Sequence, residues 1–230
     1  MKTFLKVSLI LILSLIFLFG CSKEKEAEIL ESSLKQLNSP NQGDKIAVFD
    51  TDMGIFKIVL YDRIAPKAVD NFITHANNNY YDGLSFHRVI EDFLIQSGDP
   101  TNTGSGGDSA SMVPFENECS EDLHNFTGAV GMAAFEKNQN KSQFYIIAGG
   151  DISDEMINNM KIAGYSQEIV DAYIEVGGRP TLDYNYTVFG QVYEGMDVVL
   201  EINKVKVGSD NRPEKEILIK SVTIDTFIPE

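Results

Sequence analysis

In residues 85–100, SFHRVIEDFLIQSGDP, apolar residues alternate with a histidine, an arginine and a glutamine. Strict alternation along a strand would put Arg88 on the same face as Phe86 and on the opposite face from His87. A charged group is expensive to bury without a partner, so Arg88 lies either on an outer face of a sheet or in a site that needs a fixed cation. Gln96 poses the same choice between a satisfied edge group and a functional one. These residues alone leave both interpretations open.

The cysteine and histidine content offers little further chemistry. The three histidines are isolated, and neither an HExxH nor a CxxC spacing occurs, so we expect no metal site. Cys119 is the only cysteine besides Cys21, which argues against a disulfide framework. We expect the Cys119 thiol to be packed or idle rather than catalytic.

The composition limits the class of protein. The 230 residues include 34 acidic and 19 basic side chains, which give a formal charge of −15. The acidic residues are scattered and no basic stripe occurs, which argues against nucleic acid as a partner. With 43% hydrophobic residues, the chain can build one domain of ordinary size around a substantial core.

Residues 1–20 have the pattern of a targeting segment and are excluded from the expected fold. Lys2 and Lys6 give a positive start, and the apolar run that follows is short for a transmembrane helix. The run ends in LFGC at 18–21, which resembles a bacterial lipobox, so we expect a lipoprotein signal peptide and a membrane anchor on lipidated Cys21. An uncleaved anchor and a simple secretory signal are the alternatives. All three place the rest of the chain outside the cytoplasm.

Residues 21–43 are expected to form a polar tether, followed by one globular domain over 44–230. Pro66 marks the start of a helix, and alternating apolar residues predict short strands. The expected strands lie at 46–51, 55–61, 85–97 (two strands), 129–134, 142–148, 187–192 and 216–227, with helices at 64–79 and 195–202. Many short strands with two flanking helices predict a mainly β fold, a barrel capped by helices.

Several motifs of this domain occur together in a fixed order. They are FHR at 86–88, FLIQSGD at 93–99, GSGG at 104–107, FENE at 115–118, SQFYI at 142–146, LD at 182–183 and VFGQV at 188–192. In type and spacing they resemble the signature of the cyclophilins, a family of peptidyl-prolyl cis/trans isomerases, from about residue 46 to residue 226. The resemblance implies an eight-stranded antiparallel barrel capped by two helices, with a substrate groove on its outer surface.

The resemblance also implies which residues line that groove. The catalytic residues would be Arg88, Gln96 and Phe93. The residues that bind substrate would be Leu94, Ala133, Gln143, Tyr145, Leu182 and Tyr186. Of these residues, the two glutamines would hold the peptide backbone and position the arginine.

The implied reaction explains these residue types. Rotation about a peptide bond has a barrier of ~18–20 kcal/mol because resonance gives the C–N bond double-bond character. No bond is broken, so the reaction needs no nucleophile, metal or cofactor. It is helped by an apolar pocket for the proline ring, implied at Phe93, Leu94, Tyr145 and Leu182, and by a fixed donor where charge shifts. A guanidinium is rigid and always charged, so we expect Arg88 to act as an electrostatic stabiliser.

The sequence departs from the family pattern at a few groove positions. Ala134 and Phe135 stand where the family commonly has Asn-Ala, which removes an amide and adds bulk that could narrow the neighbouring pocket. Tyr186 replaces a common histidine and keeps an aromatic wall. Thr181 stands where some members have tryptophan, which predicts weak inhibition by cyclosporin. His87 is expected to be a structural, hydrogen-bonded residue.

Residues 149–180 form an insertion that resembles the extra helices of cyclophilins from low-GC Gram-positive bacteria. Ser153 is expected to cap a first helix that ends at Gly164, and residues 166–176 have the spacing of a second helix. The insertion could be a lid beside the groove or a packed ornament. We expect the ornament.

These features predict an extracytoplasmic, lipid-anchored isomerase that assists folding of secreted or surface proteins. Its expected partners are proline-containing polypeptides and the membrane, and we expect a monomer. The alternative is a binding module or holdase that grips proline-containing segments with little turnover. Retention of Arg88 and Gln96 favours the enzyme, whereas Ala134 and Phe135 leave room for the alternative.

Overall fold

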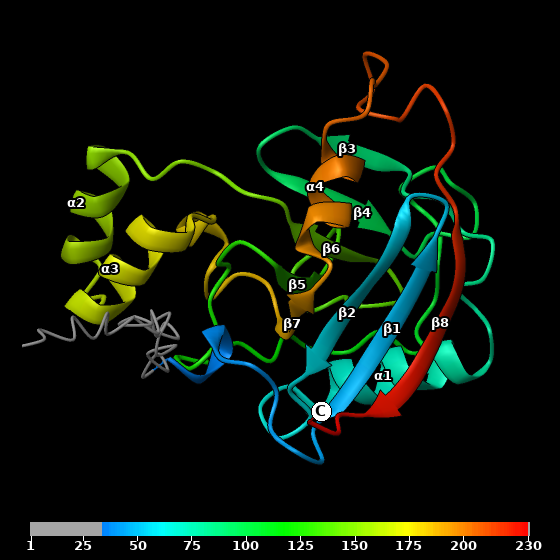
Figure 1. Ribbon diagram of the computed structural model, residues 1–230, viewed down its shortest axis with the longest axis horizontal. Helices are drawn as coiled ribbons and strands as arrows, with labels where there is room; N and C mark the ends of the chain where they lie inside the picture. The colour runs from blue at the N-terminus through cyan, green and yellow to red at the C-terminus, as the bar shows by residue number, and fades with distance from the viewer. Residues whose placement is uncertain (1–33, 230) are drawn as a thin grey trace, which may run out of the picture. The chain divides into compact units, whose positions relative to one another are not determined.

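The structure, a computed structural model, describes residues 34–229. Within this range the chain forms eight strands and four α-helices (Figure 1). Neighbouring strands are all antiparallel and make one sheet in the order β3-β4-β6-β5-β7-β2-β1-β8. The strands are β1 (Lys45–Thr51), β2 (Gly54–Leu60), β3 (Arg88–Ile90), β4 (Leu94–Ser97), β5 (Ala129–Met132), β6 (Phe144–Ile147), β7 (Val188–Glu194) and β8 (Ile219–Thr226).

The sheet curls until its two outer strands nearly meet. Ser85, just before β3, forms an antiparallel bridge with Leu218, just before β8. Next to it, the amide of Phe86 donates to the carbonyl of Ile217 at 3.0 Å. The expected eight-stranded antiparallel architecture is confirmed, in the form of a half-barrel that this short contact joins at its open side.

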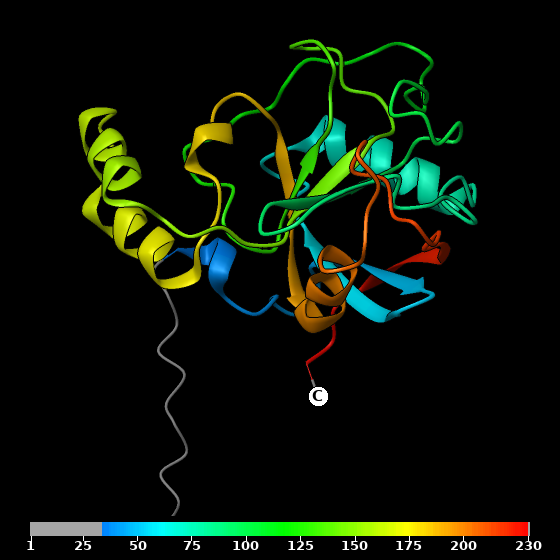
Figure 2. The same ribbon diagram turned by 90° about the horizontal axis from the view of Figure 1, so that it is seen from above.

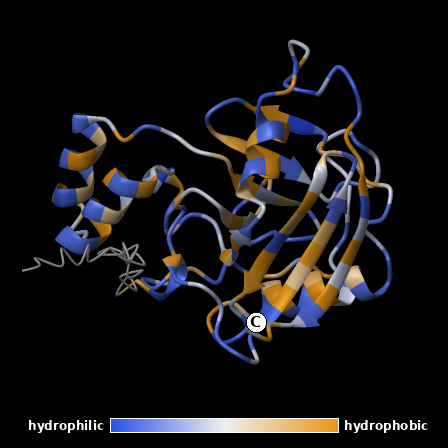
Figure 3. Cartoon of the chain, viewed as in Figure 1, coloured by the Kyte–Doolittle hydropathy of each residue, from blue (hydrophilic) through white to orange (hydrophobic). Residues whose placement is uncertain are grey.

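The inside of the curled sheet is filled by aromatic side chains. Phe49 stacks on Phe56 with ring centroids 4.6 Å apart, and Phe72 meets Phe144 edge-on at 5.9 Å. Ala47 and Phe49 of β1, and Ile219 and Val222 of β8, are buried in this core. Hydrophobic segments run along β1 and β2 in Figure 3. The helices α1 (Pro66–Asn77) and α4 (Met196–Asn203) add buried side chains to the same core.

The insertion forms the two expected helices, α2 (Asp154–Ile162) and α3 (Gln167–Val176), which lie side by side (Figure 2). Ser153 and Ser166 cap them, each accepting a hydrogen bond from a backbone amide of the first turn. Gly164, with φ +88°, lies just after α2 in a conformation that favours glycine. A 3₁₀ turn, η2 (Pro180–Leu182), then leads back to the sheet.

Part of the expected tether at 21–43 contacts the domain that is predicted to start at residue 44. A 3₁₀ turn, η1 (Lys35–Leu37), packs on the domain, and the side chain of Gln36 is buried. Its Nε2 donates to the carbonyl of His124 (2.7 Å) and to Oε1 of Gln191 (3.1 Å), while its Oε1 accepts from the amide of His124 (2.8 Å). The described part of the expected tether is therefore fixed to the domain, because it satisfies buried polar groups there.

The expected signal peptide at 1–20 and the lipidation site at Cys21 lie outside the described residues. Among residues 34–229, no helix combines the length and the apolar character needed to cross a membrane.

Candidate active site

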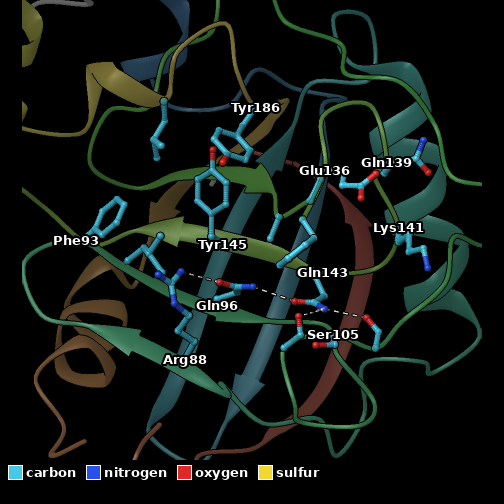
Figure 4. Close-up of a pocket in the computed structure, with 17 residues that line it drawn as sticks. Arg88, Phe93, Gln96, Ser105, Glu136, Gln139, Lys141, Gln143, Tyr145 and Tyr186 are labelled. Atoms are coloured by element: carbon cyan, nitrogen blue, oxygen red, sulfur yellow. Dashed lines mark hydrogen bonds between the residues drawn. The ribbon is translucent and has the colours of Figure 1, made fainter. Parts of the chain in front are cut away.

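A groove of about 880 Å³ on the outside of the sheet brings the predicted site residues together (Figure 4). All nine residues line it: Arg88, Phe93, Leu94, Gln96, Ala133, Gln143, Tyr145, Leu182 and Tyr186. The four residues between positions 88 and 96 come from β3, β4 and the turn between them. Tyr145 comes from β6, Leu182 from η2, and Tyr186 from the loop before β7. Residues from separate parts of the sequence thus meet at one surface.

Arg88 is half-buried at the edge of this groove, which answers the question that its sequence position raises. In the β3–β4 pair it lies opposite Gln96, and its Nη1 donates to Oε1 of Gln96 at 3.1 Å. Gln96 in turn donates through Nε2 to Oε1 of Gln143 at 2.9 Å. This amide chain holds the guanidinium in place and occupies one of its five N–H donors.

The amide chain ends on the glycine-rich loop. Nε2 of Gln143 donates to the carbonyls of Gly104 (3.1 Å) and Gly106 (2.8 Å). These contacts fix which end of the Gln143 amide faces Gln96, because its nitrogen is used by the loop and its oxygen remains to accept. The loop therefore sets the orientation of the whole chain as far as Arg88.

The loop itself is built around the buried carboxylate of Asp99. This group accepts hydrogen bonds from the amides of Thr101 (2.7 Å), Thr103 (3.1 Å), Gly104 (2.6 Å) and Gly106 (3.1 Å). Burial raises the pKa of the carboxyl group, but the hydrogen bonds from Thr101, Gly106 and Gly104 outweigh burial and lower the pKa from 3.8 to about 2. A side chain at Gly106 would lie 2.2 Å from an Asp99 oxygen, so this turn requires glycine.

The other half of the groove is apolar. Leu94 and Tyr145 are buried there, and Phe93, Leu182 and Tyr186 pack partly buried against the same cluster. The rings of Tyr145 and Tyr186 meet edge-on with centroids 6.1 Å apart. The expected aromatic wall at Tyr186 is therefore present, and the cluster offers a concave apolar surface of the kind that a proline ring can contact.

Several groove residues were not predicted from the sequence. Arg179, at the end of the insertion, does not line the groove, but it lies over the ring of the lining residue Phe93, with its guanidinium carbon 5.1 Å from the ring centroid. Four polar residues line the groove: Ser105, Glu136, Gln139 and Lys141. Loop residues of this kind follow no periodic pattern. Only the glycine-rich run that contains Ser105 indicated, from the sequence, a loop near the site.

Phe135 does not fill the groove. Its side chain is fully exposed at the rim, between the groove and a smaller hollow of about 350 Å³ that Thr181 and Asn185 also line. The bulk that the sequence predicts at this position thus extends into solvent, where it adds an apolar surface beside the groove.

His87 differs from its expected environment. The ring is buried on the side of the strand away from Arg88, as alternation predicts, but neither ring nitrogen has a hydrogen-bond partner among residues 34–229. Burial lowers its pKa, and the nearby Asp99 charge partly opposes this effect. The ring therefore lacks the hydrogen bond that the sequence predicts, although Asp99, Arg212 and Gln143 lie near it.

Residues 34–229 contain no group of three or more His, Cys, Asp or Glu side chains placed to hold a metal ion. What the groove does contain is a fixed cation beside an apolar pocket, joined by a chain of amides. An arrangement of this kind can bind an apolar ring and stabilise shifting charge on an adjacent polar group.

The curled sheet and its groove define a cyclophilin-type isomerase. Residues 46–224 match the family model described as cyclophilin type peptidyl-prolyl cis-trans isomerase/CLD, so the chain belongs to that family. It is an enzyme, a peptidyl-prolyl cis-trans isomerase, as its similarity to relatives and solved structures also supports.

The similar proteins include two bacterial relatives named as peptidyl-prolyl cis-trans isomerases. One, from Staphylococcus aureus strain USA300, is 44% identical over 191 residues, which are 83% of this chain and 97% of the relative. The other, from Staphylococcus saprophyticus, is 43% identical over 190 residues, with 82% and 96% covered. A crystal structure of a Cryptosporidium parvum cyclophilin type isomerase aligns with a TM-score of 0.64 and 27% identity, covering 80% of this chain and 99% of that one.

Proposed function

We propose that the groove lowers the rotation barrier by holding the proline ring still while Arg88 stabilises the amide as its resonance is lost. The apolar cluster around Tyr145 would take the ring. The guanidinium, held by Gln96, would donate to the peptide group where charge shifts during rotation. The observation that carries this proposal is the amide chain from the glycine-rich loop to Arg88, which fixes a cation beside an apolar pocket.

The proposed substrates are X-Pro bonds in polypeptides rather than a small metabolite. The groove is half-open and lined by both polar and apolar side chains, which suits an extended peptide. A similar Cryptosporidium parvum isomerase, 28% identical, was crystallised in the presence of the dipeptide Ala-Pro. Every predicted site residue comes from one chain, which supports activity as a monomer.

We further propose that the enzyme is lipid-anchored outside the cytoplasm and assists the folding of secreted or surface proteins. The support is the sequence: a positive start, an apolar run and a lipobox-like end at Cys21. Cells fed labelled palmitate should incorporate the label into the wild-type chain and not into Cys21→Ala. Equal labelling of both chains, or recovery of both in the cytoplasm, would contradict the anchor.

The experiment that tests the catalytic proposal is the cis-to-trans rate of a short Ala-Pro-Phe peptide with the full chain. Arg88→Ala should lower kcat/KM roughly 100-fold to 1000-fold, the usual loss when one fixed donor to a shifting charge is removed. The matched control is Arg63→Ala, because Arg63 is exposed and lies outside the groove.

The outcomes separate two functions. Acceleration that falls in Arg88→Ala and persists in Arg63→Ala supports the mechanism. A folded Arg88→Ala variant that keeps the wild-type rate would show that the guanidinium is not the stabiliser. If the wild-type chain binds the peptide without accelerating its exchange, the chain is the binding module or holdase that exposed Phe135 would suit.

A further inference from the structure

The carboxylate of Asp183, one residue after η2, is fully buried and accepts from several partners. Its Oδ1 accepts from the backbone amide (2.7 Å) and the side-chain amide (2.8 Å) of Asn125. Its Oδ2 accepts from the hydroxyls of Tyr173 (2.7 Å) and Tyr165 (3.2 Å), and lies 2.9 Å from Nδ1 of His124. Two of these donors, the tyrosine hydroxyls, belong to the insertion, on α3 and just before it.

The same network reaches the floor of the groove. The hydroxyl of Tyr145 donates to Oδ1 of Asn125 at 2.7 Å. Since the nitrogen of that amide donates to Asp183, its oxygen is the atom left to accept from Tyr145. Burial, and then the Asp183 charge, raise the pKa of Tyr145 well above its usual value, so its hydroxyl remains a donor. A continuous chain of hydrogen bonds thus runs from α3 to the apolar pocket.

The position of Tyr145 tolerates little movement. Its ring crosses the backbone of Gly131, where an added Cβ would lie 2.3 Å from the ring carbon and the hydroxyl. On its other side, the ring meets Tyr186 edge-on. Because the ring is held by close packing, the hydrogen bond to Asn125 decides where along that slot its hydroxyl end rests.

The base of the insertion is also fastened beside the pocket. The amide of Gly178 donates to the carbonyl of Gly150 (3.1 Å), which joins the two ends of the insertion. The amide of Arg179 donates to the carbonyl of Asn125 (2.8 Å), and its guanidinium lies over the ring of Phe93. The insertion therefore contacts the pocket wall at Phe93 directly, and it is linked to the pocket floor at Tyr145 through Asp183 and Asn125.

We propose that Tyr173 and Asp183 are positioning residues, through which the insertion fixes the pocket that grips the proline ring. This role differs from both a lid and a packed ornament, because the contacts that matter are buried hydroxyls beneath the groove. The inference rests on the assignment of Tyr145 to the substrate pocket. A pocket held in this way favours tight ring binding and leaves the rotation step to Arg88.

The test is a double-mutant cycle on the full chain with Tyr173→Phe, Tyr145→Phe and the double variant. Each change removes one hydroxyl and keeps the ring, so the packing of α3 and of the pocket is preserved. The readouts are kcat/KM for the Ala-Pro-Phe peptide and, separately, KM and kcat, all obtained from NMR exchange measurements. Tyr193→Phe is the matched control, because Tyr193 packs on Phe227 away from the groove.

We expect Tyr173→Phe to raise KM roughly twofold to tenfold with kcat little changed, which is the range of one net hydrogen bond. In the Tyr145→Phe background the same change should have no further effect on KM, since the connection is already broken. Tyr165→Phe should act in the same direction and less strongly, because its hydroxyl is farther from Asp183.

Two results would overturn the proposal. One is an equal effect of Tyr173→Phe on KM in both backgrounds, which would mean that it acts through overall stability. The other is a folded Tyr173→Phe variant with unchanged KM and kcat. A wild-type chain without any acceleration would instead contradict the proposed catalytic function, and peptide binding by titration would then replace KM in the same cycle.

Discussion

Two polar chains support the two halves of the groove, and they differ in burial and charge. On the Arg88 side, the hydrogen bonds run from the guanidinium through the neutral side-chain amides of Gln96, which is partly exposed, and Gln143. They end on backbone carbonyls of the glycine-rich loop. On the Tyr145 side, the hydrogen bonds run from the buried Tyr145 hydroxyl through the buried side chain of Asn125 to the buried carboxylate of Asp183. A charge-assisted network that is shielded from water is harder to distort than solvated amides. The stiffer support thus lies under the pocket proposed for the proline ring, and the more adaptable one lies beside Arg88.

The largest effect should come from removing the charge of the buried chain. In Asp183→Asn, one acceptor oxygen becomes a donor and leaves tyrosine hydroxyls or the His124 ring without a partner. We expect the free energy of unfolding to fall by about 3 kcal/mol, measured by urea denaturation. Asp151→Asn, at an exposed position of the same insertion, should change it by less than about 0.5 kcal/mol. Equal losses in both variants would remove the contrast between the chains.

Acid should destabilise the glycine-rich loop, on which the amide chain from Arg88 ends. The Asp99 pKa of about 2 in the folded protein lies below its usual 3.8, so its ionised form stabilises the fold. That contribution, about 2 kcal/mol, is complete above pH 3.8 and is lost as the pH falls towards 2. Measured by denaturation at several pH values, the difference in stability between wild type and Asp99→Asn should shrink over this interval. A difference that stays constant would mean that Asp99 is not ionised in the fold.

The smallest effect concerns the amide chain itself. Gln143→Leu removes the acceptor of Gln96 and the donor to the loop carbonyls, but it keeps Arg88 in its strand. We expect kcat/KM to fall about tenfold, close to one net hydrogen bond, whereas exposed Gln42→Leu should have no effect. A loss as large as that of Arg88→Ala would show that the amide chain is as stiff as the buried one.

Local pattern and family motifs predicted one of these chains better than the other. Arg88 and Gln96 lie on adjacent short strands, so alternation and a tight turn are enough to bring them together. The contacts of Asp183 join Asn125, in the loop before β5, to Tyr173 of the insertion. No sequence periodicity specifies a contact between such distant segments. The sequence predicted the first helix of the insertion from the Ser153 cap and the second from its spacing, but it did not predict what the tyrosines of the insertion contact.

The same reasoning applies to residues 34–43, within the expected tether. Residues 34–43 are polar and include a proline and glycine, a composition typical of a linker. Their attachment depends on Gln36, whose partners His124 and Gln191 are far away in the chain. Long-range polar contacts of single side chains leave no local trace, so the sequence did not predict that this part of the expected tether contacts the domain.

The attachment of Gln36 has a consequence for the order in which the molecule can be completed. A chain made from its N-terminus presents Gln36 early, but His124 and Gln191 emerge much later. The strand β1 likewise waits for β8, the last strand to be synthesised. The first part of the domain to leave the ribosome is therefore among the last to be fixed, and the beginning of the domain remains undocked until nearly all of it has emerged.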